Sequence, residues 1–123
     1  MGDIIYKELS YKLMGLVFKV FKNLGYGYRE KYYQRALAEE FKNEKIKYKK
    51  ESPVKLIYNN RIIGRYFIDF VVEDKIIIEL KVAKDFYTKD IKQILGYLKA
   101  KNLRLGILII ITKDGMKYKR LVN

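Results

Sequence analysis

The sequence predicts an α/β fold in which helices cover both faces of a mixed β-sheet. Apolar residues recur at helical spacing in the first third of the chain, and later runs rich in Ile, Val and Phe are typical of strands. A helical pattern separates two of these runs, which favours a parallel crossover. The expected order is ααβββαββ, and at this length we expect residues 1–123 to form a single domain.

Two amphipathic helices are predicted before the sheet. The first covers residues 3–24, with Asp3 as its N-cap and Gly25 as its stop. The second covers residues 28–44. Its inner stripe has helical spacing and consists of Glu30, Tyr33, Leu37 and Phe41.

Three strands are predicted to follow these helices. The first, residues 47–58, should lie at a sheet edge, because Pro53 lacks the N–H that a neighbouring strand would accept. Asn59 and Asn60 suit a two-residue hairpin turn, since Asn tolerates positive φ. The other two strands are expected over residues 62–72 and 75–82.

A helix and a hairpin are predicted to complete the fold. The helix begins at Thr88 or Asp90 and ends near residue 101. The uninterrupted apolar run over residues 105–111 is typical of a buried strand. A turn at Asp114-Gly115 and a short last strand over residues 117–122 are expected after it.

The composition restricts the chemistry that the chain can perform. Cysteine and histidine are both absent. Disulfides, thiolate metal sites and histidine zinc sites are therefore excluded, as are Ser-His and Cys-His nucleophile pairs. Any catalysis must use carboxylates, lysines, tyrosines, backbone groups or a hard metal ion.

The chain is strongly basic, with a formal net charge of +13 from 27 basic and 14 acidic residues. Such an excess attracts polyanions, and nucleic acid is the commonest polyanion in a cytoplasm. A lysine-rich soluble surface is the simpler explanation of the same charge. No apolar run approaches the roughly 20 residues that span a bilayer, and no secretory signal is apparent. We therefore expect a cytoplasmic protein that contacts nucleic acid and no membrane.

Charged residues interrupt the two apolar strands of the central hairpin. An isolated buried charge is costly, yet Asp69 lies within the first strand, and Glu79 and Lys81 lie near the end of the second. Glu79 and Lys81 are two positions apart, so they project from the same face of the sheet.

The length of the hairpin loop decides whether the two carboxylates meet. A two-residue loop would pair Asp69 with Ile78 and leave Glu79 on the opposite face. A three-residue loop over residues 73–75, or a bulge, would place Asp69 beside Glu79. We predict the second arrangement.

Two adjacent carboxylates repel each other, and a hard divalent cation such as Mg²⁺ relieves that repulsion. Lys81 could then orient or deprotonate an attacking water, or stabilise charge on a phosphate. An ion pair of Lys81 with Asp69 or Glu79 is the alternative, and it needs no metal.

Three short motifs resemble those of a known superfamily. Asp69, followed by Glu79-Leu80-Lys81 on the next strand, resembles the D…(D/E)-x-K signature of the PD-(D/E)XK nuclease superfamily. Residues 27–33, GYREKYY, resemble the motif of the GxxExxY family within that superfamily. Gln93 and Tyr97 resemble its Q-x-x-x-Y helix motif.

This resemblance implies a restriction-endonuclease-like αβββαβ core and metal-supported hydrolysis of phosphodiester bonds. The implied ligands of Mg²⁺ or Mn²⁺ are three carboxylates and one backbone carbonyl, those of Glu30, Asp69, Glu79 and Leu80. Lys81 would act on the water or the scissile phosphate, and Gln93 would approach from the crossover helix. We therefore expect a nuclease acting on DNA, and small basic members of the superfamily often work as homodimers.

Several of these residues have an ordinary structural alternative. Glu30 could be an acid favoured by the helix dipole in the first turn, and Gln93 could be a solvated helix residue. The corresponding alternative function is a non-catalytic nucleic-acid-binding module, or an interaction subunit, that keeps the nuclease fold.

Overall fold

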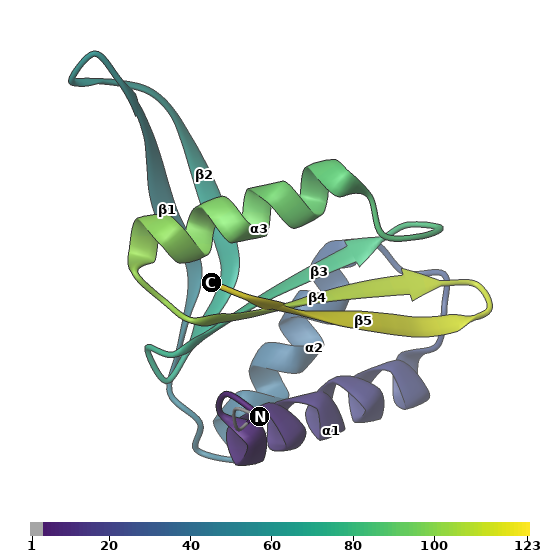
Figure 1. Cartoon of the computed structure of the whole chain (residues 1–123). Coiled ribbons are helices and arrows are strands. Elements are labelled where there is room, and N and C mark those ends of the chain that lie inside the picture. Colours follow the sequence, from purple (N-terminus) through teal and green to yellow (C-terminus); the bar gives the residue numbers. More distant parts are fainter. Residues whose placement is uncertain (1–3) are drawn as a thin grey trace.

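The computed structural model describes residues 4–123, which form a five-stranded sheet with helices on both faces (Figure 1). The predicted α/β class and the order ααβββαββ are confirmed. The elements are α1 (Lys7–Leu24), α2 (Glu30–Asn43), β1 (Tyr48–Tyr58), β2 (Arg61–Val72), β3 (Ile76–Val82), α3 (Thr88–Lys101), β4 (Leu105–Thr112) and β5 (Gly115–Val122).

The spatial order of the strands follows the chain, β1-β2-β3-β4-β5. All neighbours are antiparallel except β3 and β4, which are parallel and are joined by α3 as the predicted crossover. Every residue of β4 is buried, as expected of a strand that is paired on both edges and covered on both faces. None of the helices in the described part is long and apolar enough to cross a membrane.

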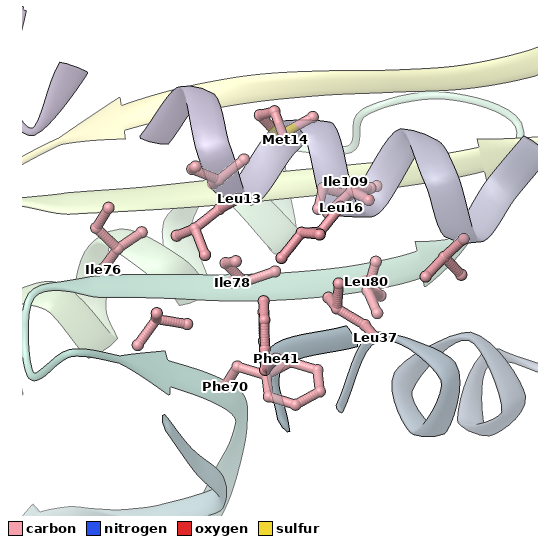
Figure 2. Close-up of a cluster of buried hydrophobic side chains, with 14 of the residues drawn as sticks. Leu13, Met14, Leu16, Leu37, Phe41, Phe70, Ile76, Ile78, Leu80 and Ile109 are labelled. Atoms are coloured by element: carbon pink, nitrogen blue, oxygen red, sulfur yellow. The ribbon is translucent and has the colours of Figure 1, made fainter. Parts of the chain in front are cut away.

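Apolar side chains fill the space on both sides of the sheet. On one side α1 and α2 pack against the central strands (Figure 2); this cluster includes Leu13, Leu37 and Phe41 from the helices and Phe70, Ile78 and Leu80 from the strands. On the other side α3 packs against the sheet; this cluster includes Ile94 and Leu98 from the helix and Ile77, Leu108 and Ile110 from the strands. Burial of these two clusters holds the three helices in place around the sheet.

The helix boundaries differ slightly from the predicted ones. Asp3, the predicted N-cap of the first helix, lies outside the described residues, and α1 begins at Lys7. Gly25, with φ of 71°, ends α1 as predicted. The second helix begins two residues later than predicted, because Arg29 is still extended (φ −68°, ψ 150°).

The predicted turn between β1 and β2 is confirmed. Tyr58 pairs with Arg61, and the two intervening residues have positive φ, 48° at Asn59 and 61° at Asn60. The turn end of this hairpin projects beyond the body of the molecule (Figure 1), and we call residues 53–67 the arm.

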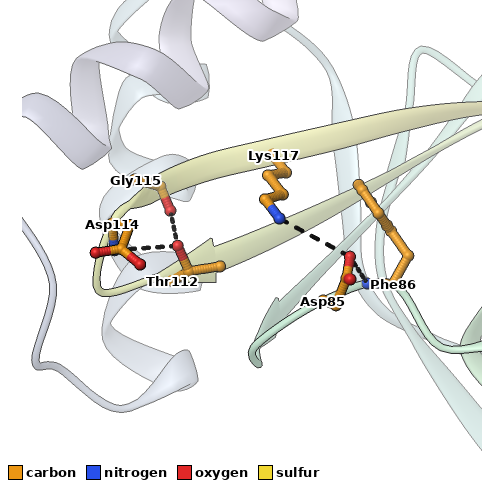
Figure 3. Close-up of polar contacts among 6 residues, drawn as sticks. All are labelled: Asp85, Phe86, Thr112, Asp114, Gly115 and Lys117. Atoms are coloured by element: carbon orange, nitrogen blue, oxygen red, sulfur yellow. Dashed lines mark hydrogen bonds and ion pairs between the residues drawn. The ribbon is translucent and has the colours of Figure 1, made fainter.

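The β4–β5 turn lies one position earlier than predicted. Thr112 pairs with Gly115, so the loop consists of Lys113 and Asp114, and Gly115 already belongs to β5. The Thr112 hydroxyl donates a hydrogen bond to the Gly115 carbonyl (2.7 Å) and accepts one from the Asp114 N–H (3.2 Å), as Figure 3 shows. These bonds fix the turn that the sequence placed at Asp114-Gly115.

The contact between α3 and β4 depends on a residue without a side chain. A Cβ added to Gly106 would lie 2.8 Å from Cγ2 of Ile94, whose side chain is fully packed. We therefore predict that Gly106→Ala lowers the free energy of unfolding by about 1–3 kcal/mol, the usual effect of overpacking.

Gly96→Ala is the matched control for this prediction. Gly96 lies inside α3, and apart from its chain neighbours and the nearby backbone of its own helix, no described heavy atom lies within 4 Å of an added Cβ. Its substitution should stabilise the protein by about 0.5–1 kcal/mol, because glycine is a poor helix former. Urea unfolding of both variants checks the pair, and a similar change in both would contradict the packing argument.

Candidate active site

The predicted site residues gather where β2 separates from β3. The two strands pair at only three positions, ending at Phe70 and Ile78, beyond which β2 continues into the arm. Side-chain alternation breaks at the same point, because Ile68 packs under α3 whereas Phe70 packs under α2. We call this point the fork, and Asp69 lies in it.

The register at the fork agrees with the predicted hairpin. Val72 pairs with Ile76, so the loop contains the three residues Glu73, Asp74 and Lys75. The prediction of a three-residue loop is confirmed, and the alternative two-residue loop is not found. As a result, Asp69 lies beside Glu79.

Two hydrogen bonds from backbone to carboxylate join the strands across the fork. The Asp69 N–H donates to Oε1 of Glu79 (2.8 Å), and the Leu80 N–H donates to Oδ2 of Asp69 (2.9 Å). Each carboxylate therefore accepts a backbone N–H from the opposite strand. These bonds replace ladder bonds at the point where the strands diverge.

Glu30 reaches the same region from α2. It is the first residue of that helix, and its Oε1 accepts a hydrogen bond from the Val82 N–H (3.3 Å), at the end of β3. The charge of Asp69 contributes to raising the pKa of Glu30, after the larger effect of burial. Glu30 and Asp69 are thus close enough for their charges to interact.

Burial disfavours the charged forms of all three carboxylates. Glu79 is only 3% exposed, and burial, followed by the nearby charge of Asp69, raises its pKa to about 8. Burial also raises the pKa of Asp69, although the Leu80 N–H opposes this shift. The fork therefore holds closely spaced acidic groups whose ionisation is unfavourable without a compensating cation.

Lys81 is near the carboxylates but is not paired with them. Its charge acts to lower the pKa of Glu30, Asp69 and Glu79. Within residues 4–123, none of the ion pairs involves Lys81. The alternative explanation, a structural ion pair with Asp69 or Glu79, is thus not found, and the ammonium group remains available to another anion.

Tyr97 is the residue of the crossover helix α3 that lies near the fork. This residue is buried, and its pKa is raised by burial and then by the charge of Glu79. Gln93, one turn earlier in α3, is half-buried and lines a groove between α3 and the arm. Among the described hydrogen bonds none joins Gln93 to the carboxylates, so its predicted approach to the site is not made by direct contact here.

One residue near the site was missed in the sequence. Gln34 follows Glu30 by four positions in α2, and its side chain acts to lower the pKa of Asp69. Residues four apart share a helix face, so helical spacing from Glu30 could have indicated it. Glu51, across β1, has the opposite effect on the pKa of Asp69.

The donor groups at the fork suit a hard divalent cation. In residues 4–123 no three acidic side chains stand close enough together to form a ready-made metal cluster. The backbone bonds occupy Oε1 of Glu79 and Oδ2 of Asp69, so one oxygen of each remains free of them. The Leu80 side chain points into the core (Figure 2), so only its backbone carbonyl could join the carboxylates as a ligand.

Comparison with known protein families shows to which superfamily the chain belongs. A family profile described as the PD-(D/E)XK nuclease superfamily matches residues 7–121. The chain belongs to the PD-(D/E)XK nuclease superfamily. Members of this superfamily are usually nucleases and typically use divalent metal ions, which agrees with the donor groups at the fork.

One solved structure supports the fold of this PD-(D/E)XK domain. The protein named SSO0001, known from a crystal structure, is similar with a TM-score of 0.56 and 19% sequence identity. The match covers 73% of this chain and 48% of SSO0001, so this chain spans about half of that protein's length. At this identity the likeness concerns the fold alone. The search of curated proteins gave no match.

The raised pKa of Glu79 predicts how stability depends on pH in the metal-free PD-(D/E)XK domain. Between its ordinary value of 4.5 and about 8, folded Glu79 keeps a proton that the unfolded chain releases. Its contribution to stability is complete below 4.5 and is lost as the pH rises through about 8. The loss amounts to at most about 1.4 kcal/mol per pH unit.

Glu79→Gln removes this titration while keeping an oxygen that can accept the Asp69 N–H. Urea unfolding in EDTA at about pH 5 and about pH 9 should show wild type losing more stability than the variant. An equal loss in both proteins would mean that Glu79 ionises normally in the folded state.

Proposed function

We propose that the protein is a nuclease that hydrolyses phosphodiester bonds of DNA with the help of Mg²⁺ or Mn²⁺. The observation that carries the proposal is the adjacency of Asp69 and Glu79 at the fork. Glu79 is buried and Asp69 is half-buried, and neither is in an ion pair among residues 4–123. A purely structural pair of buried carboxylates would be unfavourable. A bound cation gives the arrangement a physical reason.

The proposed roles follow the chemistry of each group. Asp69, Glu79 and the Leu80 carbonyl would hold the ion, with Glu30 as a further carboxylate from α2. When bound, such an ion lowers the pKa of a coordinated water and neutralises charge on a phosphate. Lys81 would stabilise the charge that develops on the phosphate, and Gln93 would position the substrate from α3.

The choice of nucleic acid, and of DNA in particular, follows from charge and resemblance. The net charge of +13 favours a polyanion such as nucleic acid as the binding partner. We propose that the protein acts in the cytoplasm. The sequence around Glu30, GYREKYY, favours the GxxExxY family within the superfamily. We propose that residues 1–123 act as one nuclease-like domain and that this domain forms a homodimer. Light scattering coupled to size-exclusion chromatography checks the oligomeric state.

Cleavage of DNA tests the proposed function directly. Asp69→Asn and Glu79→Gln remove one charge each while keeping a hydrogen-bond acceptor, so the fold should persist. Each should lower the cleavage rate in Mn²⁺ by about a hundredfold or more. Glu8→Gln, an exposed residue of α1, is the matched control and should cleave at the wild-type rate.

Metal binding can be separated from cleavage by thermal unfolding. At a Mn²⁺ concentration of about 100 times the Kd, the ion stabilises the folded state by about 2.7 kcal/mol. Wild type and Lys81→Met should both show the rise in Tm, whereas Asp69→Asn and Glu79→Gln should not. Cleavage that survives in both carboxylate variants would place the activity elsewhere.

A non-catalytic nucleic-acid-binding module or interaction subunit is the second candidate. It is favoured by the backbone hydrogen bonds that the carboxylates of Glu30, Asp69 and Glu79 accept. It is also favoured by the lack of a ready-made acidic trio in residues 4–123. Salt-sensitive binding of DNA that is unaffected by Mn²⁺ and by Glu79→Gln, without any cleavage, would establish this alternative.

A further inference from the structure

We infer that the groove between α3 and the arm binds an unpaired stretch of nucleic acid, so that the substrate is a single strand or carries a single-stranded segment. The inference rests on the proposed nuclease function and specifies its substrate. The groove has a volume of about 430 Å³. Its lining includes Leu56 and Tyr66 from the arm and Lys89, Lys92, Gly96 and Tyr97 from α3.

The charge of the groove suits a phosphate backbone. Lys55, Lys89 and Lys92 line it, and none of the acidic residues in the described part of the chain does. Among the ion pairs of the described residues none involves these three lysines. Their charges are therefore not neutralised by the protein and can attract phosphates.

The aromatic lining distinguishes an unpaired strand from a duplex. Tyr66 lies on the α3-facing side of the arm, lines the groove and is 43% exposed. Its ring centroid lies 6.1 Å from that of Tyr97. A base can stack on such a ring only when it is unpaired, because the faces of bases in a duplex are covered by their neighbours.

The groove leads to the fork. Tyr97 lines the groove and is also close enough to Glu79 and Asp69 for their charges to raise its pKa. Gln93 lines the same groove one turn nearer the start of α3. A strand lying in the groove would thus pass within a short distance of the two carboxylates.

Glycine keeps the groove open on the α3 side. Gly96 lines the groove, and no described heavy atom outside the adjacent part of α3 lies within 4 Å of a Cβ added to it. The position therefore allows a large side chain to be added in a helix without disturbing the core. Such a substitution would fill the space that we assign to the substrate.

Binding of a fluorescein-labelled oligo-dT strand, measured by anisotropy in EDTA, tests the inference. Wild type should bind this strand more tightly than a duplex of the same length. Tyr66→Ala should weaken binding of the strand by about 5-fold to 100-fold, the usual effect of losing one stacked base. Tyr66→Phe keeps the aromatic ring and should bind the strand as tightly as wild type. Tyr11→Ala, an 83% exposed tyrosine of α1, is the matched control and should change nothing.

Two further pairs of variants separate the groove from the overall charge. Lys89→Glu with Lys92→Glu should weaken binding at least tenfold more than Lys12→Glu with Lys22→Glu, which makes the same change in net charge on exposed positions of α1. Gly96→Phe should weaken binding, whereas Gly15→Phe, at an exposed glycine of α1 outside the groove, should not. Equal losses in the two lysine pairs, or no loss with Gly96→Phe and Tyr66→Ala, would overturn the inference.

Cleavage of the same labelled DNAs in Mn²⁺ distinguishes the inference from the proposed function. If the strand binds in the groove but is not cut, the nuclease function is wrong and the groove stands as a single-strand site. If only the duplex is cut, at a rate that Tyr66→Ala does not change, the nuclease function stands and the inference is wrong. Cutting of the strand that Tyr66→Ala and Gly96→Phe both slow supports the two together.

Discussion

The site depends on the exchange of backbone hydrogen bonds across the fork. Where β2 leaves β3, the N–H groups of Asp69 and Leu80 lose their partners in the ladder, and the carboxylates of Glu79 and Asp69 accept them instead. Buried N–H groups must be paired, so the strands can separate only because acidic residues stand at this point. The same separation releases the arm and opens the groove beside α3. One local arrangement thus supplies the acidic pair and opens the groove that we assign to the substrate.

Electrostatics at the fork follow from its position between packed layers. Helices α2 and α3 cover it from opposite sides, through Glu30 and Tyr97, and this burial is the largest cause of the raised pKa values there. Lys81 opposes the shifts without pairing. Keeping these acidic groups together therefore lowers the stability of the domain, as is common at functional sites. Membership of the PD-(D/E)XK nuclease superfamily agrees with that interpretation.

Much of the fold could be predicted because local patterns and global packing agree. The order of helices and strands along the chain, the crossover helix and the three-residue loop over residues 73–75 follow from periodicity and from the requirement that Asp69 meet Glu79. The predicted first residues of the helices were less accurate. The extended conformation of Arg29, for example, cannot be recognised from the pattern of side chains. The hydrogen bonds that the carboxylates accept from backbone N–H groups were not predictable. They form where the pairing of β2 with β3 ends, and the sequence does not show where this pairing ends. The groove was missed for a related reason: Tyr66 and Gly96 come from elements that only the tertiary fold brings together.

The short connection between β2 and β3 has an evolutionary consequence. Side chains alternate along a strand, so gaining or losing one residue among positions 73–75 would turn either Asp69 or Glu79 to the other side of the sheet. The apolar core would survive such a change only by rearranging its own pattern. We therefore expect selection to conserve the number of residues in this connection more strictly than their identity. Insertions during divergence should accumulate instead at the far end of the arm, where Asn59 and Asn60 touch neither the core nor the acidic pair.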